Sequence, residues 1–89
     1  MADYRVRILE IATRDLDRII GWVAEQSPDG AARLLAAFER LLLVLESSPE
    51  SFSPSPESEA TGYPLRQGFF RTRRGNTHRA VFMIDRREV

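Results

Sequence analysis

The 89 residues of the chain, 43% hydrophobic and 29% charged, have the length and composition of one small globular domain, residues 1–89, and exclude wholesale disorder and a fibrous class. The absence of cysteine and the single histidine, His78, exclude disulfides, thiolate metal sites and sites built from two imidazoles, so we expect no metal and no cofactor. The net charge is zero, and no apolar run approaches the roughly 18 residues that a membrane-spanning helix needs, so we expect a cytoplasmic protein without a membrane segment.

The first residues of the chain predict a strand followed by a helix. Tyr4–Leu9, with the sequence YRVRIL, alternates apolar and mostly basic side chains with the period of two that a half-buried strand shows. The period then changes to helical spacing, with Thr13 placed to cap the helix and Asp15 placed in its first turn. We therefore expect a strand over residues 4–9 and a helix that begins with Thr13 as N-cap and ends near Gln26.

A second helix is predicted to follow almost at once. Ser27 is a preferred N-cap residue, and Pro28 is a preferred first helical residue. An apolar stripe then runs from Ala31 to Leu45 at the spacing of one helix face. Because the connection between the two helices is so short, they should form an antiparallel hairpin.

A serine- and proline-rich stretch follows the helices. Residues 47–60 read SSPESFSPSPESEA, with six serines, three prolines and three glutamates. Such a composition buries little apolar surface, so we expect a flexible Ser/Pro-rich loop over residues 47–62. Phe52 is a candidate anchor for the middle of this loop.

Two further strands, Leu65–Arg73 and Thr77–Ile84, are predicted after the loop. Arg74-Gly75-Asn76 joins them with a Gly-Asn pair that tolerates the positive φ of tight turns, so the strands should form an antiparallel hairpin. The order β-α-α-β-β predicts an α+β fold in which a two-helix hairpin covers one face of an antiparallel sheet. Unless Asp85–Val89 begins another strand, the hairpin keeps an unpaired edge that can accept a strand from a partner or from a second copy.

The positive charge is concentrated in the carboxy-terminal third and consists entirely of arginine. Residues 61–89 hold seven arginines and two acidic residues, a net charge of +5, whereas residues 1–60 hold six arginines and eleven acidic residues, a net charge of −5. Because side chains alternate across a strand, the apolar residues that face the helices leave five arginines and two apolar residues on the open face of the sheet. These predicted partner-binding residues are Arg5, Arg7, Arg71, Arg73, Arg79, Val81 and Met83.

Two interpretations of this open face stay possible from the residues alone. Charged side chains are the default on the solvated face of an antiparallel sheet. A patch of one sign, however, builds a field that attracts phosphates or an acidic protein segment. Alternation points His78 toward the helices, which favours a structural role over a catalytic one.

Five short motifs, spread over nearly the whole chain, match one known family. In chain order they are a strand that begins YRV, a helix start of the form Ala-x-x-Asp-Leu, a second helix that begins Ser-Pro, the segment PLRQG and the strand HRAVFMI. Together they resemble the RelE/ParE family, the toxins of bacterial type II toxin–antitoxin pairs, often labelled plasmid stabilisation proteins. The resemblance implies a β-α-α-β-β-β core, of which the last strand is expected to be missing here, and an antitoxin that wraps the toxin.

The resemblance also implies one of two targets. RelE-like members cut mRNA on the ribosome with basic residues of the open sheet face, whereas ParE-like members inhibit DNA gyrase. Arg71, Arg73 and Arg79 match the basic positions of RelE-like members and are candidate catalytic residues that would clamp a phosphate. The tyrosine or histidine and the further arginine of the RelE-like set would lie beyond Val89. The sequence pI of about 6.6 also departs from the strongly basic RelE-like members.

The function favoured by these observations is a toxin that is neutralised by an antitoxin and is ParE-like rather than an active nuclease. The alternatives are a RelE-like, ribosome-dependent mRNA endoribonuclease and a truncated, non-toxic interaction module. The chain would be an enzyme only if it were the endoribonuclease. The expected partners are an antitoxin encoded by a neighbouring gene, DNA gyrase or the ribosome with its mRNA, and a second copy bound as a homodimer through the edge strand.

Overall fold

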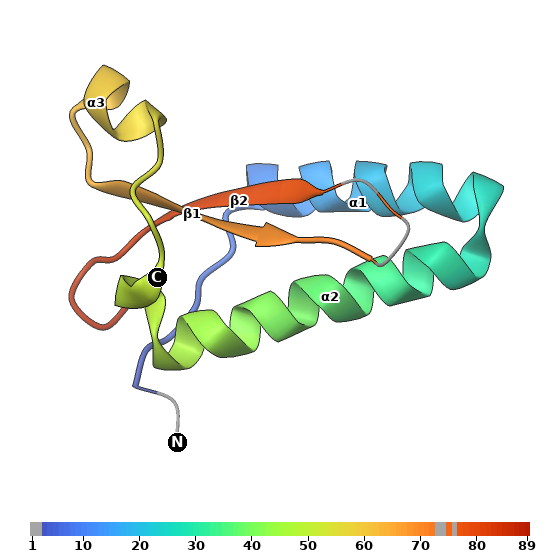
Figure 1. Cartoon of the computed structure of the whole chain (residues 1–89), viewed down its shortest axis with the longest axis horizontal. Coiled ribbons are helices and arrows are strands. Elements are labelled where there is room, and N and C mark those ends of the chain that lie inside the picture. The colour runs from blue at the N-terminus through green and yellow to red at the C-terminus, as the bar shows by residue number, and fades with distance from the viewer. Residues whose placement is uncertain (1–2, 73–74, 76) are drawn as a thin grey trace.

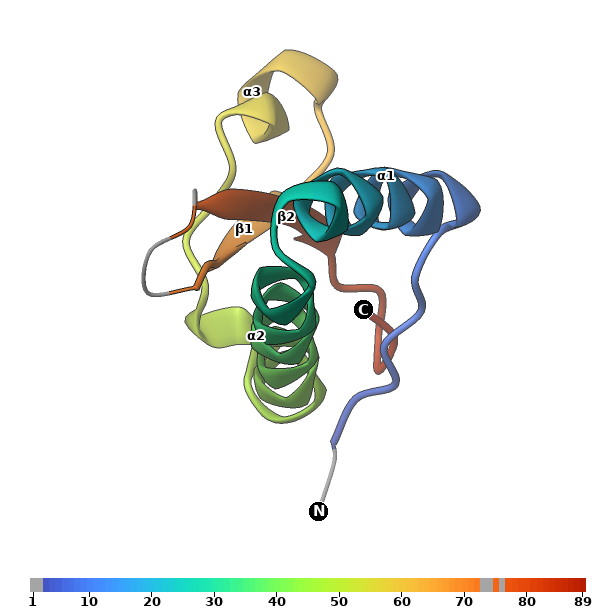
Figure 2. The same cartoon turned by 90° about the vertical axis from the view of Figure 1, so that its right-hand side faces the viewer.

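The computed structural model describes residues 3–72, 75 and 77–89. The elements are α1 (Glu10–Gln26), α2 (Pro28–Ser47), the short 3-10 helix η1 (Pro49–Ser51), α3 (Glu57–Thr61), β1 (Leu65–Phe70) and β2 (His78–Met83). Figures 1 and 2 show α1 and α2 side by side against the β hairpin, with α3 on the side of the sheet away from α2. The predicted α+β arrangement, an antiparallel sheet with a two-helix hairpin on one face, is confirmed.

Helix α1 begins at Glu10, three residues before Thr13. The prediction that Thr13 caps this helix is therefore wrong. The Thr13 main-chain N–H already donates to the carbonyl of Leu9 at 3.0 Å, inside the first turn. Glu10 places a negative charge in that turn and accepts a hydrogen bond from Arg14 Nη2 at 2.6 Å. The interaction of this charge with the helix dipole and the ion pair with Arg14 both favour the earlier start.

Helix α2 begins as predicted and supplies most of the core. Ser27 Oγ accepts a hydrogen bond from the Gly30 main-chain N–H at 3.0 Å, and Pro28 is the first helical residue. Most of the predicted apolar stripe packs into the core, with α1 against it through half-buried residues, whereas Leu35 of that stripe is 41% exposed. The buried residues of α2 are Ala31, Leu34, Ala37, Leu41 and Leu45.

Substitution of Ser27 by alanine should test the cap. The change removes the side-chain acceptor of the Gly30 N–H, so the free energy of unfolding should fall by about 0.5–2 kcal/mol. Equilibrium denaturation in urea measures this difference. Ser53→Ala, at an exposed position of similar chemistry, should change the midpoint little, and an equal loss in both variants would contradict a capping role.

The two strands pair in antiparallel register, from Leu65 opposite Met83 to Phe70 opposite His78. The face toward the helices carries buried Phe70 and half-buried Phe82, and the outer face carries exposed Arg79 and Val81. This alternation confirms the predicted orientation of both strands. β1 ends at Phe70 and β2 begins at His78, so the strands are shorter than predicted. The predicted Arg73 end and the Arg74 and Asn76 turn positions lie outside the described residues.

Residues 48–62, which we call the strap, form η1 and α3, and residues 53–55 between these helices run along the free edge of β1. The main-chain N–H of Ser55 donates to the carbonyl of Leu65 at 2.9 Å, and that of Gln67 donates to the carbonyl of Ser53 at 3.0 Å. This differs from the loop without regular structure that the composition suggests, because polar main-chain groups of the strap find partners on a strand.

The strap is also anchored by side chains. Arg66 Nη1 donates to the carbonyls of Glu50 and Phe52 at 2.9 and 2.8 Å, and the rings of Phe52 and Phe82 pack edge to face at 5.5 Å. Gly68 allows this closure, since a Cβ there would lie 3.0 Å from a Leu41 methyl and 3.2 Å from the Phe52 ring. Phe52 thus anchors the strap, as its position suggested.

The amino-terminal segment does not form the predicted strand over residues 4–9. Arg5 makes an isolated parallel bridge with Glu88, through bonds from Arg5 N–H to the Arg87 carbonyl (2.8 Å) and from Val89 N–H to the Arg5 carbonyl (2.9 Å). A further bond joins Arg7 N–H to the Val89 carbonyl at 2.7 Å. The alternation of YRVRIL reflects this local pairing with residues 87–89, which is too short to make a ladder.

Candidate functional site

Arg79 lies at the centre of a polar cluster on the outer face of β2. Its Nη1 donates to Glu57 Oε1 at 2.8 Å and its Nη2 donates to Glu57 Oε2 at 2.5 Å, so the planar fork holds both oxygens of one carboxylate. Nη1 also donates to Gln67 Oε1 at 3.2 Å. The side chains of Arg79 and Glu57 keep 37% and 42% of their surface exposed, so the pair remains in contact with water.

Glu57 reaches this position because the strap turns into α3 at Ser55. The buried Ser55 hydroxyl donates to Glu57 Oε1, and the Glu57 main-chain N–H donates back to Ser55 Oγ at 3.3 Å. The Arg79 guanidinium first, and then the Ser55 hydroxyl, stabilise the charged carboxylate and lower the pKa of Glu57 to about 2. The same carboxylate raises the pKa of Arg79.

This pKa shift predicts how the ion pair depends on pH. Because folding lowers the pKa of Glu57 from 4.5 to about 2, its contribution to stability is full above pH 4.5 and is lost as pH falls toward 2. Because the pair is partly exposed, wild type should be only slightly more stable than Glu57→Gln at pH 6, and this small difference should have almost vanished at pH 2. Urea midpoints between pH 2 and 6 measure it. Glu59→Gln on the same helix should show no such pH dependence, and a constant difference for Glu57→Gln would refute the coupling.

Apolar side chains surround the polar cluster on the outer face. Phe69 lies directly opposite Arg79 in the strand register. Val81 and Met83 follow on the same face of β2, and all three apolar side chains are exposed, Phe69 by 56%. The surface formed by Phe69, Arg79, Val81 and Met83, here called the outer surface, combines a cation with apolar area and so suits a protein segment that carries both acidic and apolar residues.

The structure brings together only part of the predicted arginine face. Arg71 is exposed and lies one residue beyond the end of β1, whereas Arg73 lies outside the described residues. Arg5 and Arg7 are exposed but belong to the segment that pairs with residues 87–89, and Arg7 Nη1 lies 3.8 Å from a carboxylate oxygen of Glu88. Among the described residues, these two arginines are therefore not part of the β1–β2 sheet.

Three residues of the site were not among its predicted members. Alternation along β1 already puts Gln67 and Phe69 on the same face as Arg71, but their positions opposite Val81 and Arg79 follow from the strand register, which sequence alone did not define. Glu57 lies 22 residues from Arg79, and no local pattern links an acidic residue in a proline-rich stretch to a strand that distant. A long-range contact of this kind is visible only after folding.

His78 faces away from the outer surface, as alternation predicted. Its ring lies 5.5 Å from that of Phe70, at an interplanar angle of 30°. Within the part of the chain that the structure describes, Glu57 is the only titratable side chain that contacts Arg79. The described residues therefore place no pair of acid and base groups beside this arginine.

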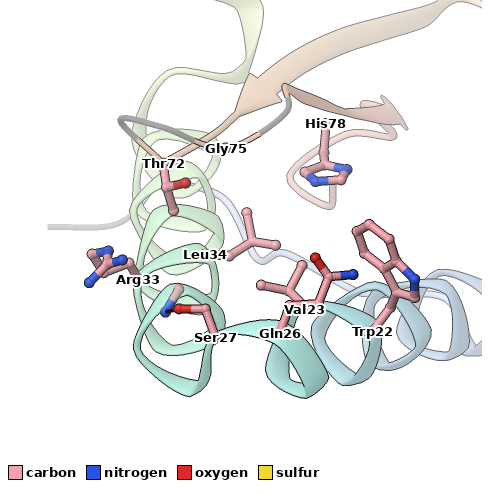
Figure 3. Close-up of a pocket in the computed structure, with 10 residues that line it drawn as sticks. Trp22, Val23, Gln26, Ser27, Arg33, Leu34, Thr72, Gly75 and His78 are labelled. Carbon is pink, nitrogen blue, oxygen red and sulfur yellow. Dashed lines mark hydrogen bonds between the residues drawn. The ribbon is translucent and has the colours of Figure 1, made fainter.

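A cavity of about 670 Å³ lies on the side of the sheet that His78 faces. Figure 3 shows residues of α1, such as Trp22 and Gln26, opposite Thr72 and His78 of the β hairpin. Gly75 of the hairpin connection and residues at the start of α2 complete the lining. Because Arg79 and His78 are adjacent in β2, the cavity and the outer surface lie on opposite faces.

No group of three His, Cys, Asp or Glu side chains among residues 3–72, 75 and 77–89 could hold a metal ion. Over the same described residues, neither α1 nor α2 combines the length and the hydropathy that a membrane span requires.

Comparison with known proteins identifies a family. A family model described as "ParE toxin of type II toxin-antitoxin system, parDE" matches residues 6–89 of the chain. A search of curated proteins finds no match, and a search of solved structures finds none either. The matched span includes both helices, the strap and both strands.

Proposed function

We propose that this chain, which belongs to the ParE toxin family of type II toxin–antitoxin systems, is a toxin that an antitoxin neutralises and that acts on DNA gyrase rather than by cutting RNA. The antitoxin binds the outer surface, where Arg79 meets an acidic residue of the antitoxin and the exposed apolar side chains meet its apolar residues. The family membership supports the toxin role, and the geometry around Arg79 supports the choice against a nuclease.

The occupation of Arg79 is the observation that carries this choice. Cleavage of RNA through its 2′-OH needs a base, an acid and a cation that holds the phosphate. Arg79 could fill only the third role, and its fork already holds the Glu57 carboxylate. His78 is the only histidine of the chain, and its side chain lies on the other face of the strand.

The charge of the chain supports the same conclusion. Binding to ribosomal RNA depends on many cations, because each phosphate contact releases counterions. This chain has a net charge of zero, and two of its exposed arginines, Arg79 on the outer surface and Arg7 in the amino-terminal segment, are paired with carboxylates. The outer surface is therefore better suited to bind a protein than ribosomal RNA.

Controlled expression tests the proposal. Residues 1–89 are expressed under a tight promoter with and without the adjacent gene, and the purified chain is added to a gyrase supercoiling assay and to ribosomes translating a defined mRNA. Growth arrest that the adjacent gene relieves, with loss of supercoiling, is the expected result. Cut mRNA with unaffected gyrase would establish the RelE-like alternative, and normal growth with a soluble, folded chain would refute a toxin role.

A further inference from the structure

The fork of Arg79 holds a ligand that belongs to the same chain. Two parallel hydrogen bonds to the two oxygens of Glu57 are the geometry with which a guanidinium binds a carboxylate of any origin. The carboxylate is delivered by the strap, whose residues 53–55 run along the edge of β1. The free chain therefore shows an occupied carboxylate site in the middle of an otherwise exposed surface.

We propose that Glu57 is an internal ligand of the Arg79 fork and that an acidic side chain of the antitoxin takes its place when the two proteins bind. This inference rests on the proposed function, since it names the partner group that the outer surface recognises. The strap thus competes with the partner for Arg79 and weakens binding until its carboxylate is displaced.

The surroundings of Arg79 favour a carboxylate over a phosphate as the incoming group. The site now holds a planar group with two oxygens, and Gln67 Oε1 already occupies a further position at 3.2 Å from Nη1. A phosphate would bring additional anionic oxygens toward that acceptor. Phe69 and Val81 beside the fork are exposed and apolar, so the matching segment carries an aspartate or glutamate next to apolar residues.

The exchange requires little rearrangement of the strap. The main-chain bonds of Ser53 and Ser55 to β1 do not involve the Glu57 side chain and can persist when the carboxylate leaves. The leaving carboxylate is already 42% exposed, so it can return to water by side-chain rotation. Because exposed ion pairs contribute little to stability, the closed arrangement should exceed the open one by only about two- to fivefold.

The first arm of the test uses the chain alone. Phenylglyoxal modifies accessible guanidinium groups, and mass spectrometry of peptides gives the rate at Arg79. Glu57→Gln and Glu57→Ala should react about two to five times faster than wild type at this residue, whereas Glu59→Gln should react at the wild-type rate. Circular dichroism verifies that each variant is folded. Equal rates at Arg79 in all four proteins would overturn the internal-ligand assignment.

The second arm measures binding of the purified product of the adjacent gene by titration calorimetry. Its dissociation constant should fall about two- to fivefold for Glu57→Gln and Glu57→Ala and stay unchanged for Glu59→Gln. Protection of Arg79 with an unchanged dissociation constant would overturn the exchange but leave the proposed function intact. No binding to any variant would overturn both. If Glu57→Gln bound a ribo-oligonucleotide more tightly than wild type, with unchanged affinity for the product of the adjacent gene, the incoming ligand of Arg79 would be a phosphate and the proposed carboxylate would be wrong.

Discussion

Replacing Phe70 with alanine is expected to lower the free energy of unfolding by about 3–5 kcal/mol. Phe70 is 7% exposed and joins β1 to the buried stripe of α2. Its ring packs edge to face on Phe38 at 5.2 Å and lies 5.5 Å from the His78 ring. The variant loses these contacts and leaves a cavity between sheet and helix, so urea denaturation should show a large fall in the midpoint.

Phe69→Ala is the matched control, because it removes the same group from the next residue of β1. Phe69 is 56% exposed on the opposite face, so its loss should cost less than about 1 kcal/mol, since little buried area disappears. Similar losses for both variants would mean that the sheet does not present two different faces. The same control should weaken antitoxin binding, because Phe69 belongs to the outer surface.

Local patterns predicted the helices and the faces of the strands. The helical spacing of apolar residues, with Ser27 as the cap, defined α2 to within two residues of its end at Ser47. The start of α1 was predicted too late because Thr13 is a better capping residue than Leu9. In the structure, the extra helical turn, with Glu10 near the positive end of the helix dipole, stabilises the helix more than a Thr13 cap would. The alternation of apolar and basic residues over 4–9 also could not show that this segment pairs only with residues 87–89.

The strap and the site depend on contacts between distant parts of the chain. Composition gave no sign that Ser53 and Ser55 would bond to β1, because main-chain hydrogen bonds leave no mark on the side-chain pattern. Alternation placed Arg79 and Val81 correctly on the outer face. It could not show that Glu57 would reach Arg79, since that contact depends on the path of the strap around the sheet edge.

Arg79→Ala should reduce the affinity for the product of the adjacent gene by about ten- to a hundredfold, as expected for an arginine at the centre of an interface. The variant removes the only fork on the outer surface that the described residues form with a carboxylate. Titration calorimetry measures the change. The urea midpoint of Arg79→Ala should stay close to that of wild type, because both members of the ion pair are partly exposed and water can hydrate the Glu57 carboxylate in the variant.

Two further variants separate the shape of Arg79 from its charge. Arg79→Lys keeps the charge but loses the planar fork, so it should recover only part of the affinity. Arg18→Ala removes an equally charged but more exposed side chain from α1, away from the outer surface. It should bind within about twofold of wild type, since a charge outside the interface contributes little to affinity. Full recovery of the affinity by Arg79→Lys would show that the partner recognises only the positive charge at this position.

Wild-type affinity in Arg79→Ala would mean that the antitoxin binds another surface. The cavity between α1 and the β hairpin would then be the next site to test.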